Sequence, residues 1–214
     1  MQQTTQSVEC QKRVAPHRIS GAARFCKRLF DIVCSLVGLV VWSPLMLVIY
    51  LAIKLEDGGP VLFHQERIGF RGRPFNLVKF RSMVVGAEAN GAQLYHNGDE
   101  RLTRVGRFIR DYHIDELPQL WNVLIGEMSF VGYRPERKVF IDRIMQHDAR
   151  YADLYATRPG LFSWATLYNG YTDTMEKMLK RLEMDLEYME KATFWLDMKI
   201  ITLTTFSILT GKKF

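Results

Sequence analysis

The middle of the chain combines two acids, a helix signal and an arginine, and residues 110–135 read RDYHIDELPQLWNVLIGEMSFVGYRP. Asp115 and Glu116, the acid pair, precede Pro118. Proline is favoured in the first turn of a helix, where a missing N–H breaks no hydrogen bond. Apolar residues follow at positions 117, 120, 121 and 124, the spacing of one helical face. We therefore predict a helix that starts beside the acid pair.

The acid pair and the residues after this helix together indicate a site for anions. A helix N-terminus keeps a nearby carboxylate ionised and also attracts anions. Gly126, Gly132 and Pro135 interrupt the chain soon afterwards and would return Arg134 towards the acid pair. This arrangement predicts phosphate and metal chemistry. The alternative is that the two acids only cap a helix and that the arginines are solvated.

Composition limits the classes of partner and cofactor. The 214 residues have a formal net charge of +6, which suits nucleic acid, anionic lipid or phosphate-rich substrates. The three cysteines all lie within the first 34 residues and have neither disulfide nor zinc spacing, as expected in a reducing compartment. The five histidines form no HxH or HxxxH pair, so we do not expect a histidine-bound metal.

Residues 32–53 form a run of 22 residues without a charged side chain. As a helix with a rise of 1.5 Å per residue, this run would be about 33 Å long, enough to cross a bilayer. It is too long for a signal peptide and no small-residue cleavage site follows it. Because it is apolar on every side, a buried core helix is disfavoured. A spanning helix and a re-entrant helix are the remaining alternatives.

Charge and proline favour the re-entrant alternative. Cytoplasmic flanks of membrane helices are enriched in lysine and arginine, and both flanks of this run are basic. Ser43 and Pro44 lie in its middle. Proline removes a helical hydrogen bond, and a serine hydroxyl can satisfy the freed carbonyl. We expect a helix that breaks at Ser43-Pro44, enters one leaflet and returns; spanning helices with proline are the alternative.

The segment after the apolar run predicts a small sheet. Strands are expected at 61–63 and 75–83, with a basic turn at 67–74 between them. Lys79 and Arg81 would share one face of the second strand, where they could bind a diphosphate or lie on an exposed edge. Residues 88–100 predict a polar surface loop.

The second half of the chain predicts mainly helices, at 104–110, 138–156 and 175–189. In the first of these, Arg104, Arg107 and Arg110 would share one face, and arginine is suited to bidentate phosphate contacts. The apolar segment 198–209 is interpreted either as an interfacial helix or as a segment docked into the core.

Several motifs occur in the order found in a known family. They are KRLFD at 27–31, the run broken at Ser43-Pro44, GPVLF at 59–63, QERIG at 65–69, KFRSM at 79–83, DELPQLWNVL at 115–124, MSFVG at 128–132, Arg134-Pro135 and RPG at 158–160. Over about residues 25–210, the chain resembles the bacterial sugar transferase family. We expect its small monotopic phosphoglycosyl transferase form, because no large membrane domain precedes residue 25.

The resemblance implies a domain organisation. It implies an α/β catalytic domain, mostly helical with a small sheet, over 56–214, with interfacial amphipathic helices. It implies a re-entrant membrane helix over 25–55, and residues 1–24 are interpreted as a flexible basic tail. The catalytic domain would lie on the cytoplasmic face of the bacterial inner membrane.

The resemblance also implies a reaction, the transfer of a sugar 1-phosphate from a UDP-sugar to polyprenyl phosphate, usually undecaprenyl phosphate, with release of UMP. In this family the aspartate that matches Asp115 holds the phospho-sugar covalently, with Mg²⁺ as cofactor. Asp115 and Glu116 would bind the metal, and Glu116 would support it or act as a base towards the acceptor. The implied substrate contacts are Lys79, Arg81, Arg110, Arg134, Pro135 and Arg158.

The elementary chemistry agrees with this implication. A carboxylate that attacks a diphosphate needs its charge offset, which Mg²⁺ and cationic side chains can supply. Covalent catalysis in two displacements lets a soluble donor and a lipid acceptor use one site in turn. The product would enter the first membrane step of surface glycan synthesis (exopolysaccharide, capsule, O-antigen or glycoprotein). Membrane lipid and downstream glycosyltransferases are therefore further expected partners.

The sequence departs from the family pattern at three places. Tyr133 stands where the family often has proline, and His113 where it often has serine. Ser163-Trp-Ala-Thr166 replaces the more usual Gly-Trp-Ala-Gln. These departures concern the placement of the nucleotide sugar. Two other classes of function compete with the enzyme: a catalytically silent membrane scaffold, and a nucleic-acid binder, which rests on the basic charge alone and has no supporting motif.

Overall fold

The computed structural model describes residues 20–210 except residues 90, 95, 97 and 171. Most of the predicted tail over 1–24 therefore lies outside the described residues. The prediction is wrong for its last residues, because a long helix starts at Gly21, and the Ser20 hydroxyl caps it by accepting from the N–H of Ala23 at 3.2 Å.

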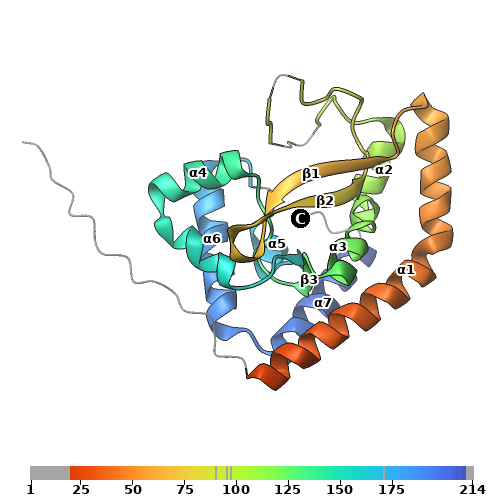
Figure 1. The fold of residues 1–214 in the computed structure, drawn as a ribbon. Coiled ribbons are helices and arrows are strands. Elements are labelled where there is room, and N and C mark those ends of the chain that lie inside the picture. Colours follow the sequence, from red (N-terminus) through yellow and green to blue (C-terminus); the bar gives the residue numbers. More distant parts are fainter. Residues whose placement is uncertain (1–19, 90, 95, 97, 171, 211–214) are drawn as a thin grey trace, which may run out of the picture.

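The described chain is mostly helical, with two small sheets (Figure 1), as the resemblance implied. One sheet is an antiparallel hairpin and the other pairs two short parallel strands. The α-helices are α1 (Gly21–Asp57), α2 (Arg104–Asp111), α3 (Gln119–Ile125), α4 (Lys138–His147), α5 (Trp164–Asn169), α6 (Met175–Lys191) and α7 (Phe194–Leu209). The strands are β1 (Leu62–Ile68), β2 (Pro74–Phe80), β3 (Ser129–Val131) and β4 (Gly160–Phe162). Short 3₁₀ helices are η1 (Phe70–Gly72), η2 (Ile114–Glu116) and η3 (Ala149–Ala156).

Several element boundaries differ from the predicted ones. β1 runs to Ile68, so the turn of the hairpin is shorter than the predicted 67–74. β2 ends at Phe80, so the strand predicted to reach residue 83 stops early. The helix predicted at 138–156 divides at Asp148, whose side chain accepts from the N–H of Arg150 at 2.8 Å and starts the separate turn η3. The helices predicted at 104–110 and 175–189 are confirmed as α2 and α6.

The helix α1 has 37 residues and changes direction partway along its length (Figure 1). Pro44 lies inside it and cannot donate to the carbonyl four residues earlier, that of Val40. The hydroxyl of Ser43 donates to this carbonyl at 2.7 Å, so it supplies the bond that proline removes. By length and composition, α1 is the one described helix that could cross a membrane, and most of its apolar residues are exposed.

The N-terminal half of α1 is fixed to the domain by polar contacts. The guanidinium of Arg28 donates to the carbonyls of Val123 and Leu124, both at 2.7 Å. Asp31 is buried and accepts from the hydroxyl of Ser129 at 3.1 Å. These contacts hold the first turns of α1 against α3 and β3.

The C-terminal end of α1 contacts the same domain at a different place. A carboxylate oxygen of Glu56 accepts from the backbone N–H groups of Arg104 at 2.7 Å and Val105 at 3.2 Å, at the start of α2. Asp57 pairs with Arg81, the residue that follows β2. Both ends of the apolar helix therefore meet one folded unit.

Two apolar cores position the elements of the site. One packs the end of α1 against β2 and α2, with Ile53, Phe80 and Ile109 fully or nearly buried. The larger core joins α4, η3 and α6 around residues such as Ile144 and Leu182. The hairpin contributes to both cores, Ile68 to the larger and Phe80 to the smaller, and Ile114 of η2, next to the acid pair, packs against the smaller one.

Candidate active site

The acid pair lies in a tight connection between two helices. α2 ends at Asp111, and His113 then adopts a left-handed conformation with φ of 55°, which turns the chain into η2. Asp115 and Glu116 belong to η2, and α3 starts only at Gln119. The prediction that the acid pair sits at the start of the helix is therefore corrected: a separate 3₁₀ turn holds it, and Pro118 separates this turn from α3.

Glu116 is the centre of an ion-pair network. Its Oε1 accepts from Nζ of Lys79 at 3.0 Å and from Nη2 of Arg134 at 2.9 Å. Lys79 comes from β2 and Arg134 follows β3, so three separate segments meet here. Burial alone would raise the pKa of Glu116, but Lys79, Arg134 and His113 together hold this pKa well below its usual range.

Asp115 differs from its neighbour because it is almost completely buried and has a free oxygen. Its exposed fraction is 3%, and its Oδ1 has no hydrogen-bond partner among the described residues. Burial raises the pKa of Asp115; the positive charge of Lys79 opposes this shift, and the negative charge of Glu116 adds to it. A buried carboxylate oxygen without a partner is unusual and marks this atom as a candidate for chemistry.

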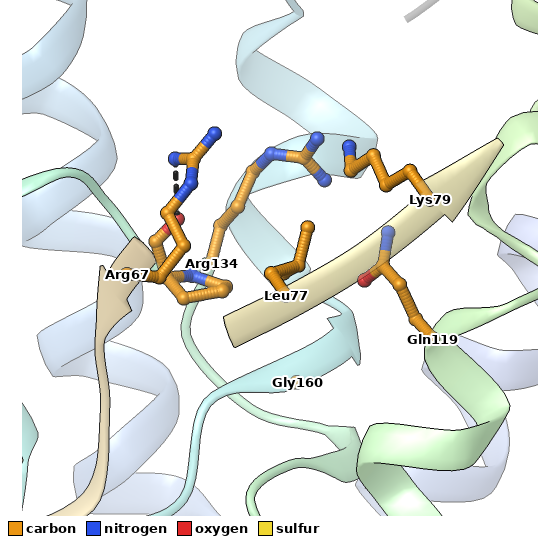
Figure 2. A pocket seen from close by; sticks show the side chains of 7 residues that line it. Arg67, Leu77, Lys79, Gln119, Arg134 and Gly160 are labelled. Carbon is orange, nitrogen blue, oxygen red and sulfur yellow. Dashed lines mark hydrogen bonds between the residues drawn. The ribbon is translucent and has the colours of Figure 1, made fainter. Parts of the chain in front are cut away.

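Hydrogen-bond donors converge beside the acid pair in a small polar pocket (Figure 2). Its lining is Arg67, Leu77, Lys79, Gln119, Arg134, Pro135 and Gly160. In Figure 2 the guanidinium of Arg134 lies between the charged ends of Arg67 and Lys79. Arg67 is held by the carbonyl of Pro135 at 2.9 Å. The amide nitrogen of Gln119 is buried and has no partner among the described residues. The free volume of this pocket is about 10 Å³, which is room for about one water-sized group, so its four donor side chains could bind oxygens at the edge of an anion.

A second, larger hollow lies on the other side of Arg134. This apolar cavity has a volume of about 610 Å³ and is lined mainly by α1, α7, the η2–α3 segment and β4. Arg134 lines both the polar pocket and the apolar cavity, and Glu116 also lines the cavity. Glu116 therefore connects the two hollows: it lines the apolar cavity and bonds to Lys79 and Arg134 of the polar pocket, while Asp115 is its buried neighbour and lines neither.

The structure brings some predicted site residues together and separates others. Pro135 lines the polar pocket with Lys79 and Arg134. Arg110 donates to the hydroxyl of Ser82 at 3.4 Å and lies close enough to lower the pKa of Asp115.

Two predicted contacts lie away from this group. Arg81 pairs with Asp57 rather than joining Lys79, because β2 ends before it. Arg158 donates to the carbonyl of Gly126 at 2.8 Å and lies 5.2 Å from the ring centre of Phe70. Substrate contacts by Arg81 and Arg158 stay predictions.

Several residues that shape the site were not predicted from the sequence. Arg67 and Gln119 lie inside the quoted motifs, yet nothing local marked them as pocket residues. Asp185 is 2% exposed on α6 and accepts from the hydroxyl of Ser163 at 2.8 Å and from the backbone N–H of Arg134. Burial raises the pKa of Asp185 to about 7. Its position on the buried face of a helix, beside Leu182 and Leu186, was the available signal.

The acid pair offers a limited but suitable donor set for magnesium. Among the described residues, no group of three or more histidine, cysteine or acidic side chains could hold a metal. Mg²⁺ does not need such a group, because it usually takes one or two carboxylates and completes its shell with substrate phosphate oxygens and water. The unpartnered Oδ1 of Asp115, next to Glu116, fits this mode of binding.

Comparison with known proteins adds independent findings. The family model for bacterial sugar transferases matches residues 22–211. The chain is 42% identical over 187 residues to a UDP-N-acetylgalactosamine-undecaprenyl-phosphate N-acetylgalactosaminephosphotransferase of Aeromonas hydrophila, covering 87% of this chain and 44% of the relative. It is 41% identical to a UDP-glucose:undecaprenyl-phosphate glucose-1-phosphate transferase of Caulobacter vibrioides, covering 86% of this chain and 70% of the relative. An uncharacterized sugar transferase of Bacillus subtilis is 37% identical, with 87% and 88% covered. The chain thus spans less than half the length of the Aeromonas relative.

Proposed function

The chain belongs to the bacterial sugar transferase family, and we propose that it transfers a sugar 1-phosphate from a UDP-sugar to undecaprenyl phosphate, releasing UMP. Relatives named for N-acetylgalactosamine and for glucose support this general reaction. They differ in their sugars, so the donor of this protein is to be found among UDP-sugars of this kind.

One observation carries the proposal. Glu116, next to the buried Asp115, lines an apolar cavity that α1 helps to form, and it bonds to Lys79 and Arg134, which line a pocket of hydrogen-bond donors. A soluble diphosphate requires the first environment, and a phosphate on a lipid requires the second. A soluble phosphatase would need only the polar pocket, whereas this arrangement suits a reaction between water-soluble and membrane-bound substrates.

We further propose that α1 is a re-entrant membrane helix in the inner membrane and that the domain lies on its cytoplasmic face. Support comes from the two ends of α1, since Arg28 and Glu56 both bond to the same folded unit. A straight helix of this length across a bilayer would leave its ends on opposite sides. The change of direction partway along α1 (Figure 1), the presence of Pro44 within this helix and the basic flanks agree with a helix that enters one leaflet and returns.

The first step of the proposed mechanism is attack by a carboxylate oxygen of Asp115 on the phosphorus that bears the sugar. The new bond joins this oxygen to phosphorus, the bond from phosphorus to the bridging oxygen breaks, and UMP leaves with the electron pair. Lys79 and Arg134 offset the negative charge that accumulates. In the polar pocket, Arg67 and Gln119 are placed to bind the diphosphate oxygens.

The second step uses the same phosphorus. A phosphate oxygen of undecaprenyl phosphate attacks it, the bond to Asp115 breaks, and the carboxylate is regenerated with the release of undecaprenyl diphosphate sugar. Glu116 holds Lys79 and Arg134 in place through one oxygen in both steps. The two attacks come in turn, so a single site serves both substrates.

Magnesium would be held by Asp115 and Glu116 together with oxygens of the substrate. When bound, it would supply positive charge to the transferring phosphate. Lys79 and Arg134, which are fixed by ion pairs with Glu116, would neutralise the rest of the negative charge on the phosphates. One metal ion held by two carboxylates is therefore sufficient in this proposal.

The product suits a role at the first membrane step of surface glycan synthesis, with glycosyltransferases acting next. A catalytically silent scaffold is the competing function. The unpartnered oxygen of Asp115 favours the enzyme, because a scaffold gains nothing from a buried carboxylate that lacks a partner.

The proposal is tested by measuring UMP release from a panel of UDP-sugars, starting with UDP-glucose and UDP-N-acetylgalactosamine, in the presence of Mg²⁺ and undecaprenyl phosphate. The wild-type protein should release UMP, and Asp115→Asn should lower the rate by at least about 1000-fold, as expected when a nucleophile is lost. Asp142→Asn, on the exposed face of α4, is the matched control and should retain activity. Full activity in Asp115→Asn would refute this nucleophile, and no release with any donor would favour the scaffold.

A further inference from the structure

Two helices far apart in the sequence each present one face to the apolar cavity, and the face of α7 combines isoleucine with threonine. From α1 the stripe is Cys34, Gly38, Trp42 and Leu45, and from α7 it is Ile201, Thr204, Thr205 and Ile208. Both stripes have the spacing of one helical face. The cavity is therefore a feature that two separate helices build together, one of them the proposed membrane helix.

The remaining walls give the cavity a polar end. Leu117 and Leu120 add apolar surface from the η2–α3 segment. His113, Glu116 and Arg134 also line the cavity, and Glu116 is the neighbour of Asp115. An occupant with an anionic head and a hydrocarbon body would place its head beside the acid pair and its body between the stripes.

The volume limits how much of an occupant fits. Cavities that bind small molecules measure roughly 300–1,000 Å³, and this one measures about 610 Å³. It can hold a few isoprene units, so most of a long polyprenyl chain must lie elsewhere. Other apolar side chains of α1, including Val41 and Leu47, are exposed outside the cavity and could contact the rest of the lipid chain.

We propose that this cavity binds the isoprene units next to the phosphate of the lipid acceptor. These units would pack between the cavity-lining faces of α1 and α7. The proposal rests on the proposed function, which supplies the acceptor. Most of the lining is apolar, so the many polar groups of a nucleotide would find few partners between α1 and α7, although polar side chains such as His113, Ser163 and Thr166 line other parts of the wall. A hydrocarbon chain that carries one phosphate matches both the apolar walls and the charged end.

The proposal is tested by narrowing the cavity without touching the acid pair. Thr205 and Thr202 are both exposed on α7, but only Thr205 lines the cavity. Thr205→Trp and Thr202→Trp are therefore matched variants. We would measure two quantities in each: the UMP burst from UDP-sugar without acceptor, and the KM for undecaprenyl phosphate.

We expect Thr205→Trp to raise this KM at least tenfold and to leave the UMP burst unchanged, while Thr202→Trp changes neither. An unchanged KM in folded Thr205→Trp, checked by its thermal unfolding, would overturn the proposal. The outcome is distinct from failure of the proposed function, in which even the wild-type protein would show no burst.

A second measurement uses the wild-type protein alone, so it does not depend on a variant that folds. Prenyl phosphates with one to four isoprene units would serve as acceptors, with inorganic phosphate as reference. We expect KM to fall with each added unit until the cavity is full and then to level off. A KM independent of chain length over this series would contradict the proposal.

An isosteric change separates a hydrocarbon occupant from a polar one. The hydroxyl of Thr204 is buried in the cavity wall and has no partner among the described residues. Thr204→Val removes this hydroxyl and keeps the shape. We expect the KM for undecaprenyl phosphate to stay equal or fall, whereas a rise of several-fold would indicate a polar occupant at this point and count against the proposal.

Discussion

The two hollows on either side of Arg134 are built on different principles. In the polar pocket, each charged group is fixed by a named partner, as Lys79 is by Glu116 and Arg67 by the carbonyl of Pro135. In the apolar cavity, the walls are helical stripes with few directional contacts. Side chains are therefore fixed by specific hydrogen bonds on the side where charge has to be stabilised. The other side needs only shape and an apolar surface, which suits a flexible lipid chain.

The largest effect is expected at the residue that borders both hollows. Arg134→Met removes a donor to Glu116 and should lower the rate of UMP release by about 100–1000-fold, the range found when one stabilising donor is lost. It should also raise the KM for the lipid acceptor, because Arg134 lines the cavity. Arg134→Lys keeps the charge and should lose less. Rapid-quench measurement of the two half-reactions would check this. A defect confined to one half-reaction would contradict the claim that Arg134 serves both the donor and the acceptor.

A smaller and one-sided effect is expected at Lys79, which lines only the polar pocket. Lys79→Met should reduce the UMP burst by about 100-fold and leave the KM for undecaprenyl phosphate within twofold. Lys138→Met, an exposed residue on α4, provides the control for loss of a positive charge. If the two kinetic quantities changed equally, the division between donor and acceptor sides would be wrong.

Asp185, which accepts from the backbone N–H of Arg134, predicts that the free energy of unfolding depends on pH. The pKa of Asp185 is about 7 in the folded protein and is near 3.8 when unfolded, so the folded state holds the proton more tightly. The proton on Asp185 contributes its full stabilisation of the folded state below the unfolded-state pKa of 3.8. This stabilisation is lost as pH rises through about 7. The groups that act on this carboxyl are Arg181, Ser163, the N–H of Arg134 and Glu136.

Asp185→Asn removes this titration and keeps an oxygen that can accept from Ser163. The gain in stability of the variant over the wild type should be smallest near pH 4.5, about 1 kcal/mol, and largest at pH 8, at most about 4 kcal/mol for a shift of this size. Thermal unfolding in detergent across this pH range is the measurement. A stability difference that stayed constant from pH 4.5 to 8 would contradict the assignment.

The smallest effect is expected on the cavity side, at the bend of α1. Ser43→Ala leaves the carbonyl of Val40 without its donor and should destabilise the protein by about 1 kcal/mol. Adding Pro44→Ala should restore most of this loss, because position 44 then has an N–H for the same carbonyl. Thermal unfolding of the single and double variants in lipid nanodiscs would test this double-mutant cycle, and additive effects would speak against a shared acceptor.

The parts of the fold that depend on local patterns could be predicted from the sequence. The long apolar helix with Ser43 and Pro44 and the helices α2 and α6 follow from composition and spacing. The boundaries of β2 and the division at Asp148 did not follow, because tertiary contacts and a side-chain cap decide them.

For the site as well, residues in local motifs could be predicted, whereas contacts between distant segments could not. The acid pair, Lys79 and Arg134 belong to recognisable motifs, and the structure does bring them together. Arg81 was expected beside Lys79, but Asp57 at the end of α1 pairs with it instead, a contact between segments that the local pattern does not join. The role of Asp185 depends on a contact between α6 and the loop of Arg134, about 50 residues away in the chain.

Positive charges flank the apolar run of α1 on both sides, with Lys27 and Arg28 before it and Lys54 after it. Carrying a lysine or arginine to the centre of a bilayer costs about 2.5–3.5 kcal/mol on insertion scales. Since both ends of α1 bond to one domain, a helix that dips and returns moves none of these charges through hydrocarbon. Under the proposed re-entrant topology, the described residues on both sides of α1 stay on one face of the membrane, so the domain could fold there before the helix enters the lipid.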